Sequence, residues 1–249
     1  MDPLSISAAS GLRARMESLE LLANNIANAS TDGFKSDREF YSLYVSPEAA
    51  DAGASGYGAS PDTLPVIEKP WIDYAQGTLR STGNQFDLAL SGKGFFSVNG
   101  PSGPLYTRSG NFQLSSAGIL TTAEGYPVRT ADGGTLAVQP GSPIEVARDG
   151  NVLQNGQDLG QLAVGSFNEQ ADLNKQGMNY FFKTDPKTPV QTSTAEVQQG
   201  SLEKSNVGSA ESAVRLVSIM RQFEMLQKAV TIGAEMNRHA VEEVARVTS

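Results

Sequence analysis

The sequence predicts an α+β protein in which N- and C-terminal coiled-coil-type helices are brought together and flank a central antiparallel β-rich domain. Near both ends of the chain, apolar residues recur at alternating spacings of three and four, which is the period of a helix seam. Between the ends, short β-forming runs alternate with Gly-containing turns about every 8 to 15 residues. We expect an N-terminal helix over residues 1–35, an extended linker with a flexible loop over 36–75, a β domain over 76–200 and a C-terminal helix over 201–249.

The N-terminal helix is predicted from the segment between Leu4 and Ile26, which contains no proline. Asp2 stands where a helix cap is expected, and Pro3 falls in the first turn, where proline is tolerated. An Asn-rich end and the turn over residues 31–33 stop the helix. Its apolar stripe consists of Ala9, Leu12, Met16, Leu19, Ala23 and Ile26.

The linker and the β domain follow the first helix. Small and polar residues over 48–65 have little to bury, so they predict the flexible loop within the linker. From Phe86 onward, alternating and apolar runs predict strands, and Gly-containing turns separate them. The core-facing residues that we expect are Tyr106, Phe112, Leu114, Leu120, Val128, Leu136, Val138, Ile144, Val146, Val152, Leu162, Val164 and Phe167.

The C-terminal helix is predicted over residues 209–249, with Ser209 in position to cap it. At about 1.5 Å per residue such a helix is roughly 50 Å long, which is longer than the diameter of a small domain. Ile219 and Leu226 widen its apolar stripe, and charged residues fill much of the opposite surface. The stripe itself consists of Ala213, Leu216, Met220, Phe223, Gln227, Val230, Ala234, Asn237, Val241 and Val244.

The two apolar stripes can be buried in two ways. They can pack against each other within one chain, or they can pack against other subunits. Two helices that meet only each other leave much apolar surface uncovered, which favours packing between subunits. Leu216→Asp or Phe223→Asp is then expected to abolish assembly and to spare the β domain. The predicted subunit-interface residues are Leu12, Met16, Leu19, Asn24, Asn25, Ile26, Asn28, Leu216, Met220, Phe223, Val230 and Val241.

The three asparagines of this set have two interpretations. Asn24, Asn25 and Asn28 offer amide groups for hydrogen bonds between subunits. Simple termination of the helix explains each of them equally well, because asparagine side chains readily bond to nearby backbone groups.

Composition excludes several classes of function. The formal net charge is −8 with a pI near 4.8, which disfavours nucleic acid and anionic membranes as partners. There are no cysteines, so disulfides and thiolate metal sites are excluded. No apolar run approaches the length of a transmembrane helix. The N-terminus lacks a basic start and an apolar core, so we expect no cleaved signal peptide.

The sequence offers little material for catalysis. His239 is the single histidine and lies among charged neighbours, as expected for a solvated helix position. Residues 92–96 resemble the start of a phosphate-binding loop but lack its third glycine and a following helix. Asp87, Asp132 and Asp149 are better explained as turn residues than as paired catalytic carboxylates. We therefore predict no enzyme activity, no cofactor, no metal and no small-molecule substrate.

Four blocks in order along the chain resemble the family of bacterial flagellar rod and hook proteins. Residues 22–35 (LANNIANASTDGFK) match the family's ANN-[IL]-AN motif and the TxGFK turn after it. Residues 76–98 and two segments within 106–128 resemble its central part, and residues 199–207 with 221–224 resemble its C-terminal part. The resemblance covers nearly the whole chain.

The resemblance implies a non-enzymatic structural subunit of the basal-body rod, which polymerises through its terminal helices into a hollow helical drive shaft for flagellum-dependent motility. It also implies export, unfolded and without a cleaved signal, through the flagellar export apparatus to a rod that spans the cell envelope and periplasm. Other rod and hook-basal-body subunits and copies of the chain are the expected partners. The terminal helices of free subunits in the family are typically disordered.

Within the family, residues 221–224 (RQFE) most resemble the proximal rod protein. A distal rod subunit is the alternative within the family. A secreted β-domain binding protein, or a factor that binds flagellar subunits without joining the tube, is the alternative outside it.

Overall fold

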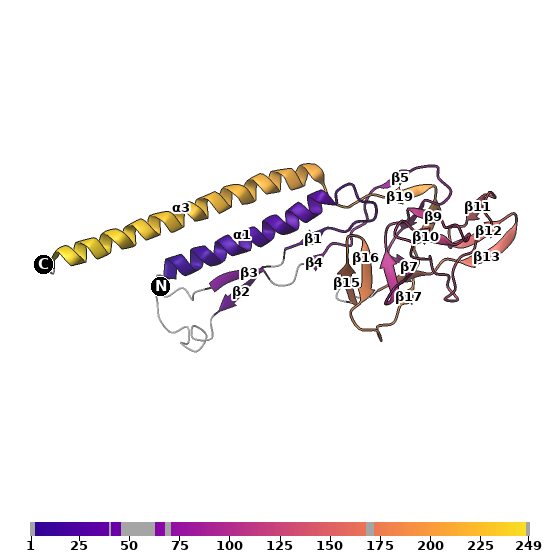
Figure 1. Ribbon diagram of the computed structural model, residues 1–249, viewed down its shortest axis with the longest axis horizontal. Helices are drawn as coiled ribbons and strands as arrows, with labels where there is room; N and C mark the ends of the chain where they lie inside the picture. The colour runs from indigo at the N-terminus through magenta and orange to yellow at the C-terminus, as the bar shows by residue number, and fades with distance from the viewer. Residues whose placement is uncertain (1–2, 40, 46–62, 68–70, 168–171, 248–249) are drawn as a thin grey trace. The chain divides into compact units, whose positions relative to one another are not determined.

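The computed structural model describes residues 3–39, 41–45, 63–67, 71–167 and 172–247 (Figure 1). It confirms the predicted order of an N-terminal helix, an antiparallel β-rich region and a C-terminal helix. The chain divides into two units. The helix unit comprises Met1–Ile26, Asp37–Trp71 and Gly208–Ser249, and the β unit comprises Ala27–Ser36 and Ile72–Val207.

The helix unit contains α1 (Pro3–Ala27) and α3 (Ser209–Val247), which run antiparallel in Figure 1. Near α1 the chain forms four short strands in two pairs, β1 with β4 and β2 with β3, and the β2–β3 pair is antiparallel. Residues 48–62 of the expected loop lie outside the described residues, and its last three residues belong to β3. The strands are β1 (Asp37–Arg38), β2 (Tyr41–Val45), β3 (Thr63–Ile67) and β4 (Trp71–Ile72).

The α1 face that packs on α3 is built from small residues. A Cβ atom added to Gly11 would lie 3.4 Å from Leu226 Cδ1, so the two helices are in contact here. In an antiparallel register through this contact, Ala14 and Ser18, both buried, fall opposite Phe223 and Ile219. Small side chains on α1 thus make room for large ones on α3. The Ser18 hydroxyl donates to the Ala14 carbonyl at 2.9 Å within the same helix.

The same register shows how far along α3 the described part of α1 extends. It places Pro3 near Ala234, so the described part of α1 ends there while α3 continues to Val247. Gly233 is buried and Met236 is exposed, as this arrangement requires. Neither helix, within the described residues, has an apolar stretch of the length and hydropathy that crossing a bilayer requires.

The β unit is assembled from antiparallel strands. Its largest sheet has six strands in the order β15-β16-β8-β7-β14-β17, and a three-stranded sheet has the order β11-β12-β13. The strands β9 and β10, β6 and β18, and β5 and β19 form separate pairs. The strands are β5 (Leu79–Ser81), β6 (Leu88–Ser91), β7 (Phe95–Gly100), β8 (Gly103–Thr107), β9 (Phe112–Leu114), β10 (Leu120–Thr122), β11 (Ile144–Val146), β12 (Asn151–Gln154), β13 (Gln157–Gln161), β14 (Val164–Ser166), β15 (Leu173–Gln176), β16 (Tyr180–Lys183), β17 (Gln191–Thr192), β18 (Glu196–Gln199) and β19 (Ser201–Glu203).

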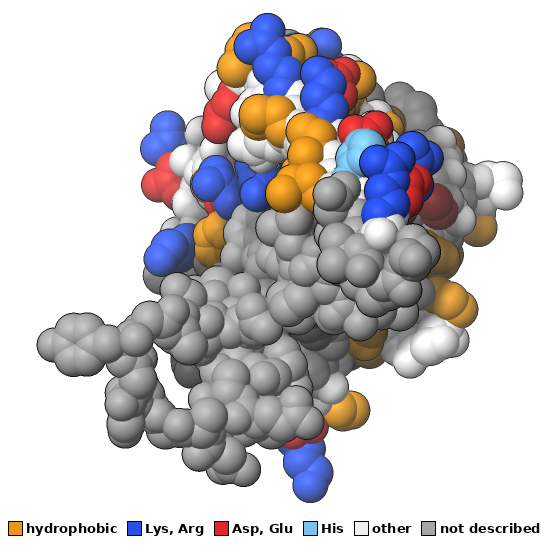
Figure 2. Space-filling view, turned by 90° about the vertical axis from the view of Figure 1, so that its left-hand side faces the viewer, with side chains coloured by type: hydrophobic (Ala, Val, Ile, Leu, Met, Phe, Trp, Pro, Cys, Tyr) orange, Lys and Arg blue, Asp and Glu red, His pale blue; other side chains and the backbone are white. Residues whose placement is uncertain are grey.

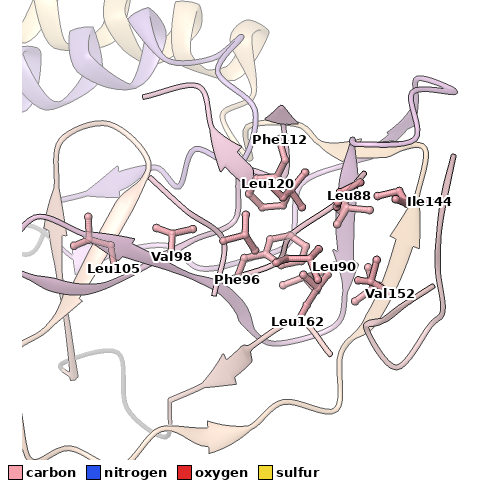
Figure 3. Packing of buried hydrophobic residues seen from close by; sticks show 14 of the residues in the cluster. Leu88, Leu90, Phe96, Val98, Leu105, Phe112, Leu120, Ile144, Val152 and Leu162 are labelled. Carbon is pink, nitrogen blue, oxygen red and sulfur yellow. The ribbon is translucent and has the colours of Figure 1, made fainter. Parts of the chain in front are cut away.

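The core of the β unit confirms the predicted inward-facing set. Every member of that set is either buried or packed against a buried cluster. Phe96 stacks edge-to-face on Phe112 at a centroid distance of 5.3 Å in the main cluster (Figure 3). A second cluster contains Phe95, Tyr106 and Phe181. Burial of this apolar surface gives the β unit a core of its own.

Candidate functional site

The three candidate carboxylates confirm the turn interpretation. Asp87 accepts hydrogen bonds from the Thr82 hydroxyl at 2.6 Å and from the Asn84 amide at 3.1 Å. Asp132 accepts from the backbone N–H of residue 134, two positions on, and Asp149 from that of residue 151. Each carboxylate therefore satisfies its own turn, which is the ordinary role of aspartate there.

The single histidine lies on the surface of α3. The side chain of His239 is 75% exposed, and its Nδ1 lies 3.9 Å from Glu242 Oε2. Among the described residues, no three His, Cys, Asp or Glu side chains are grouped so as to hold a metal ion.

On α1, the predicted apolar stripe is not the face that packs against α3. Met16 is 53% exposed and Ile26 is 38% exposed, while Leu12 and Leu19 are half-buried. The stripe is turned away from the buried row of Ala14, Ser18 and Leu22 on the same helix. Much of the apolar surface that the sequence places on α1 therefore remains open in the single chain.

On α3, the predicted stripe is divided between two surfaces. Leu216, Phe223 and Val230 are half-buried on the side that carries buried Ile219, whereas Met220 is 50% exposed. The side chain of the predicted interface residue at position 241 lies outside the described residues. Sequence analysis did not include five further exposed apolar residues of α3. Val217 is one, and the other four fall near one line on the opposite side of the helix. These are Val214, Met225, Ile232 and Met236.

Figure 2 looks along the molecule towards the free ends of the helices, and there hydrophobic side chains lie exposed among charged ones on α3. Exposed apolar groups gathered on a helix are typical of a surface that another protein covers.

The asparagines near the end of α1 differ in their surroundings. The Asn25 amide donates to the Asp37 carbonyl at 2.7 Å, and its oxygen accepts from the Asp37 N–H at 2.9 Å. Asn28 is buried, and its side-chain oxygen accepts from the Thr31 hydroxyl at 3.2 Å. Asn24 is exposed. Asn28 thus bonds within the turn that ends α1, whereas Asn25 binds the backbone of β1.

A cluster of buried charges lies in the β unit and was missed by sequence reasoning. The side chains of Lys35 and Glu203 are 0% exposed, and that of Arg108 is 4% exposed. Lys35 Nζ lies 2.6 Å from Glu203 Oε1, and Arg108 Nη1 lies 3.2 Å from Glu203 Oε2. One carboxylate therefore pairs with two cations. We call these three residues the charge cluster.

Backbone carbonyl groups also accept hydrogen bonds from the two cations of the charge cluster. Lys35 Nζ also donates to the Ala75 carbonyl at 2.7 Å, and Arg108 Nη2 donates to the Gly92 carbonyl at 2.6 Å. Burial lowers the pKa of the Lys35 ammonium and of the Arg108 guanidinium, and the Glu203 carboxylate opposes this shift in both. Buried ions of this kind are tolerated only while their partners are in place.

Close backbone contact explains why position 33, two residues before Lys35, is a glycine. Gly33 has φ +73°, a left-handed conformation that other residues rarely adopt. A Cβ atom at this position would lie 2.2 Å from the Ser109 backbone nitrogen. Only glycine fits, because both the conformation and the space exclude a side chain.

Three family models match successive parts of the chain. The model for the flagella basal body rod protein matches residues 7–35, that for the flagellar hook protein FlgE/F/G D1 domain matches 89–157, and that for the flagellar basal body rod FlgEFG protein C-terminal region matches 198–242. The flagellar basal-body rod protein FlgF of Caulobacter vibrioides is 34% identical over 230 residues, which are 92% of this chain and 92% of that protein. This chain belongs to the flagellar basal-body rod protein family.

Two further relatives of the rod family span nearly the whole chain. The flagellar basal-body rod protein FlgG of Agrobacterium fabrum is 32% identical over 255 residues, covering 92% of this chain and 94% of its own length. The FlgG protein of Bacillus subtilis is 29% identical over 260 residues, covering 94% and 96%. The chain is a structural rod protein and not an enzyme, and its partners are other basal-body subunits and copies of itself.

Each matched region of the rod family contributes one member of the charge cluster. Lys35 ends the first region, Arg108 lies in the second and Glu203 in the third. In the sequence, each residue stands inside a block that resembles the family, and that was the available signal. The contact itself was not predictable from spacing, since Lys35 and Glu203 are 168 positions apart.

Proposed function

We propose that the chain is a subunit of the proximal rod and that it polymerises through its terminal helices into a hollow helical drive shaft for the flagellum. The observation that supports this most is the uncovered apolar stripe on α1, together with exposed apolar residues on α3. The exposed large apolar residues of the predicted interface, Met16, Ile26 and Met220, are the contacts that we expect to be covered by neighbouring subunits.

The energetics favour assembly over the free chain. Burying a side chain of the size of methionine or isoleucine stabilises by about 1.5 to 3 kcal/mol, and an assembled tube repeats this burial in every subunit. Helices of 25 and 39 residues, α1 and α3, supply enough length for coiled-coil-type packing with several neighbours. Contacts repeated by a rotation and a rise propagate a tube and do not close into a ring.

The proximal position is supported by residues 221–224 (RQFE), which lie on α3 and resemble the proximal rod protein. A distal position is the second candidate, since the relatives have two names, FlgF and FlgG, at similar identities. We further propose that the chain reaches the rod unfolded, through the flagellar export apparatus and without cleavage of a signal. The absence of cysteine suits such a route, because no disulfide has to form or break.

Electron cryomicroscopy of basal bodies from a strain that lacks this chain tests the proposal. A proximal subunit predicts that the rod is absent or stops near the cytoplasmic membrane, and that motility returns when the chain is supplied from a plasmid. A rod that lacks only its outer end would indicate the distal position. A complete rod with normal motility would refute both positions.

A further inference from the structure

The N-terminal and C-terminal arms of the chain meet inside the β unit. We call residues 32–36 the N-terminal arm and residues 203–206 the C-terminal arm. The Gly33 N–H donates to the Glu203 carbonyl at 2.7 Å. Lys204 Nζ lies 2.9 Å from Asp32 Oδ1. The two arms therefore contact each other directly. The N-terminal arm follows α1 in the chain, and the C-terminal arm precedes α3.

One side chain of the C-terminal arm holds several backbone groups at once. Asn206 Oδ1 accepts from the Ser36 N–H at 2.8 Å, and Asn206 Nδ2 donates to the Asp73 carbonyl at 2.7 Å. The Phe34 carbonyl accepts from the Asn206 N–H at 3.4 Å. Removing the C-terminal arm would take these partners away from the Ser36 N–H and the Phe34 carbonyl of the N-terminal arm.

Through the charge cluster, each of the two arms depends on the other. Glu203 Oε1 accepts from Lys35 Nζ and from the Gly77 N–H at 2.9 Å, and Oε2 faces Arg108. Without the C-terminal arm, Lys35 and Arg108 lose their shared carboxylate. Without the N-terminal arm, Glu203 loses one of its two cations. Either half alone contains a buried charge with an incomplete set of partners, which is strongly unfavourable.

We propose that the two arms form one cooperative junction, so that neither arm binds stably to the β unit unless the other is bound. The junction joins the two segments of the β unit from which the terminal helices continue. Because Lys35 and Glu203 are 168 positions apart, it closes only after the chain is present as far as Glu203. Stable attachment of both helices is then a single late event in folding. This inference does not depend on the position of the subunit in the rod.

Amide hydrogen exchange of the full-length chain tests the coupling. Lys35→Met changes only the N-terminal arm and leaves Glu203 paired with Arg108. The reporter is the Lys204 amide, which donates to the Thr78 carbonyl at 2.9 Å and makes no hydrogen bond to the N-terminal arm. Coupling of the size found between linked sites predicts that this amide exchanges about tenfold faster in the variant.

The reverse experiment uses Asn206→Ala in the C-terminal arm and the Gly33 amide in the N-terminal arm, again with an expected rise of about tenfold. Arg148→Met is the control, since Arg148 lies 3.9 Å from Glu196 in an exposed ion pair, and both reporters should keep their wild-type rates. Faster exchange confined to the altered arm would overturn the proposal. So would equal protection of the Val128 amide of the core and the two reporter amides in the wild-type chain, because the arms would then open only with the whole β unit.

Discussion

Met220→Asp is expected to remove the chain from the rod while leaving the β unit folded. Met220 is 50% exposed on α3, so an aspartate is solvated in the free subunit and costs little there. In an assembled rod the same carboxylate would be buried against neighbouring helices. The variant would lose about 1.5 to 3 kcal/mol of apolar burial and add the larger penalty of an unpaired charge. Motility in soft agar and the content of purified basal bodies measure the effect.

A matched control separates the helices from the β unit. Met178 is 58% exposed, but it lies between β15 and β16 in the β unit. Met178→Asp introduces the same charge at similar exposure and should leave assembly intact. Normal motility of the Met220→Asp strain would contradict the assigned role of α3. Leu216→Asp and Phe223→Asp are less informative, because both residues are half-buried on the side of α3 that carries buried Ile219.

Glu203→Gln is expected to destabilise the β unit by about 3 to 5 kcal/mol. Glutamine keeps the size of the side chain but removes the only carboxylate that contacts Lys35 and Arg108 in the charge cluster. Lys35 and Arg108 then lose the carboxylate that they share, and of these two cations Lys35 still feels the negative charge of Asp73. Urea unfolding of the full-length chain, followed by near-ultraviolet circular dichroism of the core tyrosines, measures the loss.

The control for this substitution is Glu196→Gln. Glu196 forms an ion pair with Arg148 at 3.9 Å, and both side chains are more than half exposed. Its replacement should change the stability by no more than about 0.5 kcal/mol. Equal losses in the two variants would show that the charge cluster contributes no more than a surface pair.

Periodicity and turn residues were sufficient to predict much of the fold. The apolar spacing predicted both helices, and alternation between glycine turns predicted the inward-facing residues of the β unit, such as Phe112 and Leu120. These signals lie within short stretches of the chain, so a single sequence is enough to detect them. They also identified Met16 and Met220 as members of apolar stripes before their exposure was known.

Two features could not be predicted. One depends on small side chains and not on large apolar ones, and the other joins residues that are far apart in the sequence. The α1 face that meets α3 includes Gly11, Ala14 and Ser18, which a search for large hydrophobic residues passes over. Close approach of two helices depends on small side chains, and these leave no strong hydrophobic signal. The charge cluster joins Lys35 and Glu203 from opposite ends of the chain, and only the folded β unit brings them together.

Cysteine accessibility in intact basal bodies tests most directly whether the open apolar stripes become covered in the rod. The chain contains no cysteine, so Met16→Cys and Met220→Cys each introduce a single thiol. Both thiols should react rapidly with a maleimide in the purified free subunit and should be protected in assembled rods. Equally rapid labelling of both positions in intact, functional basal bodies would contradict the proposal that the terminal helices hold the rod together.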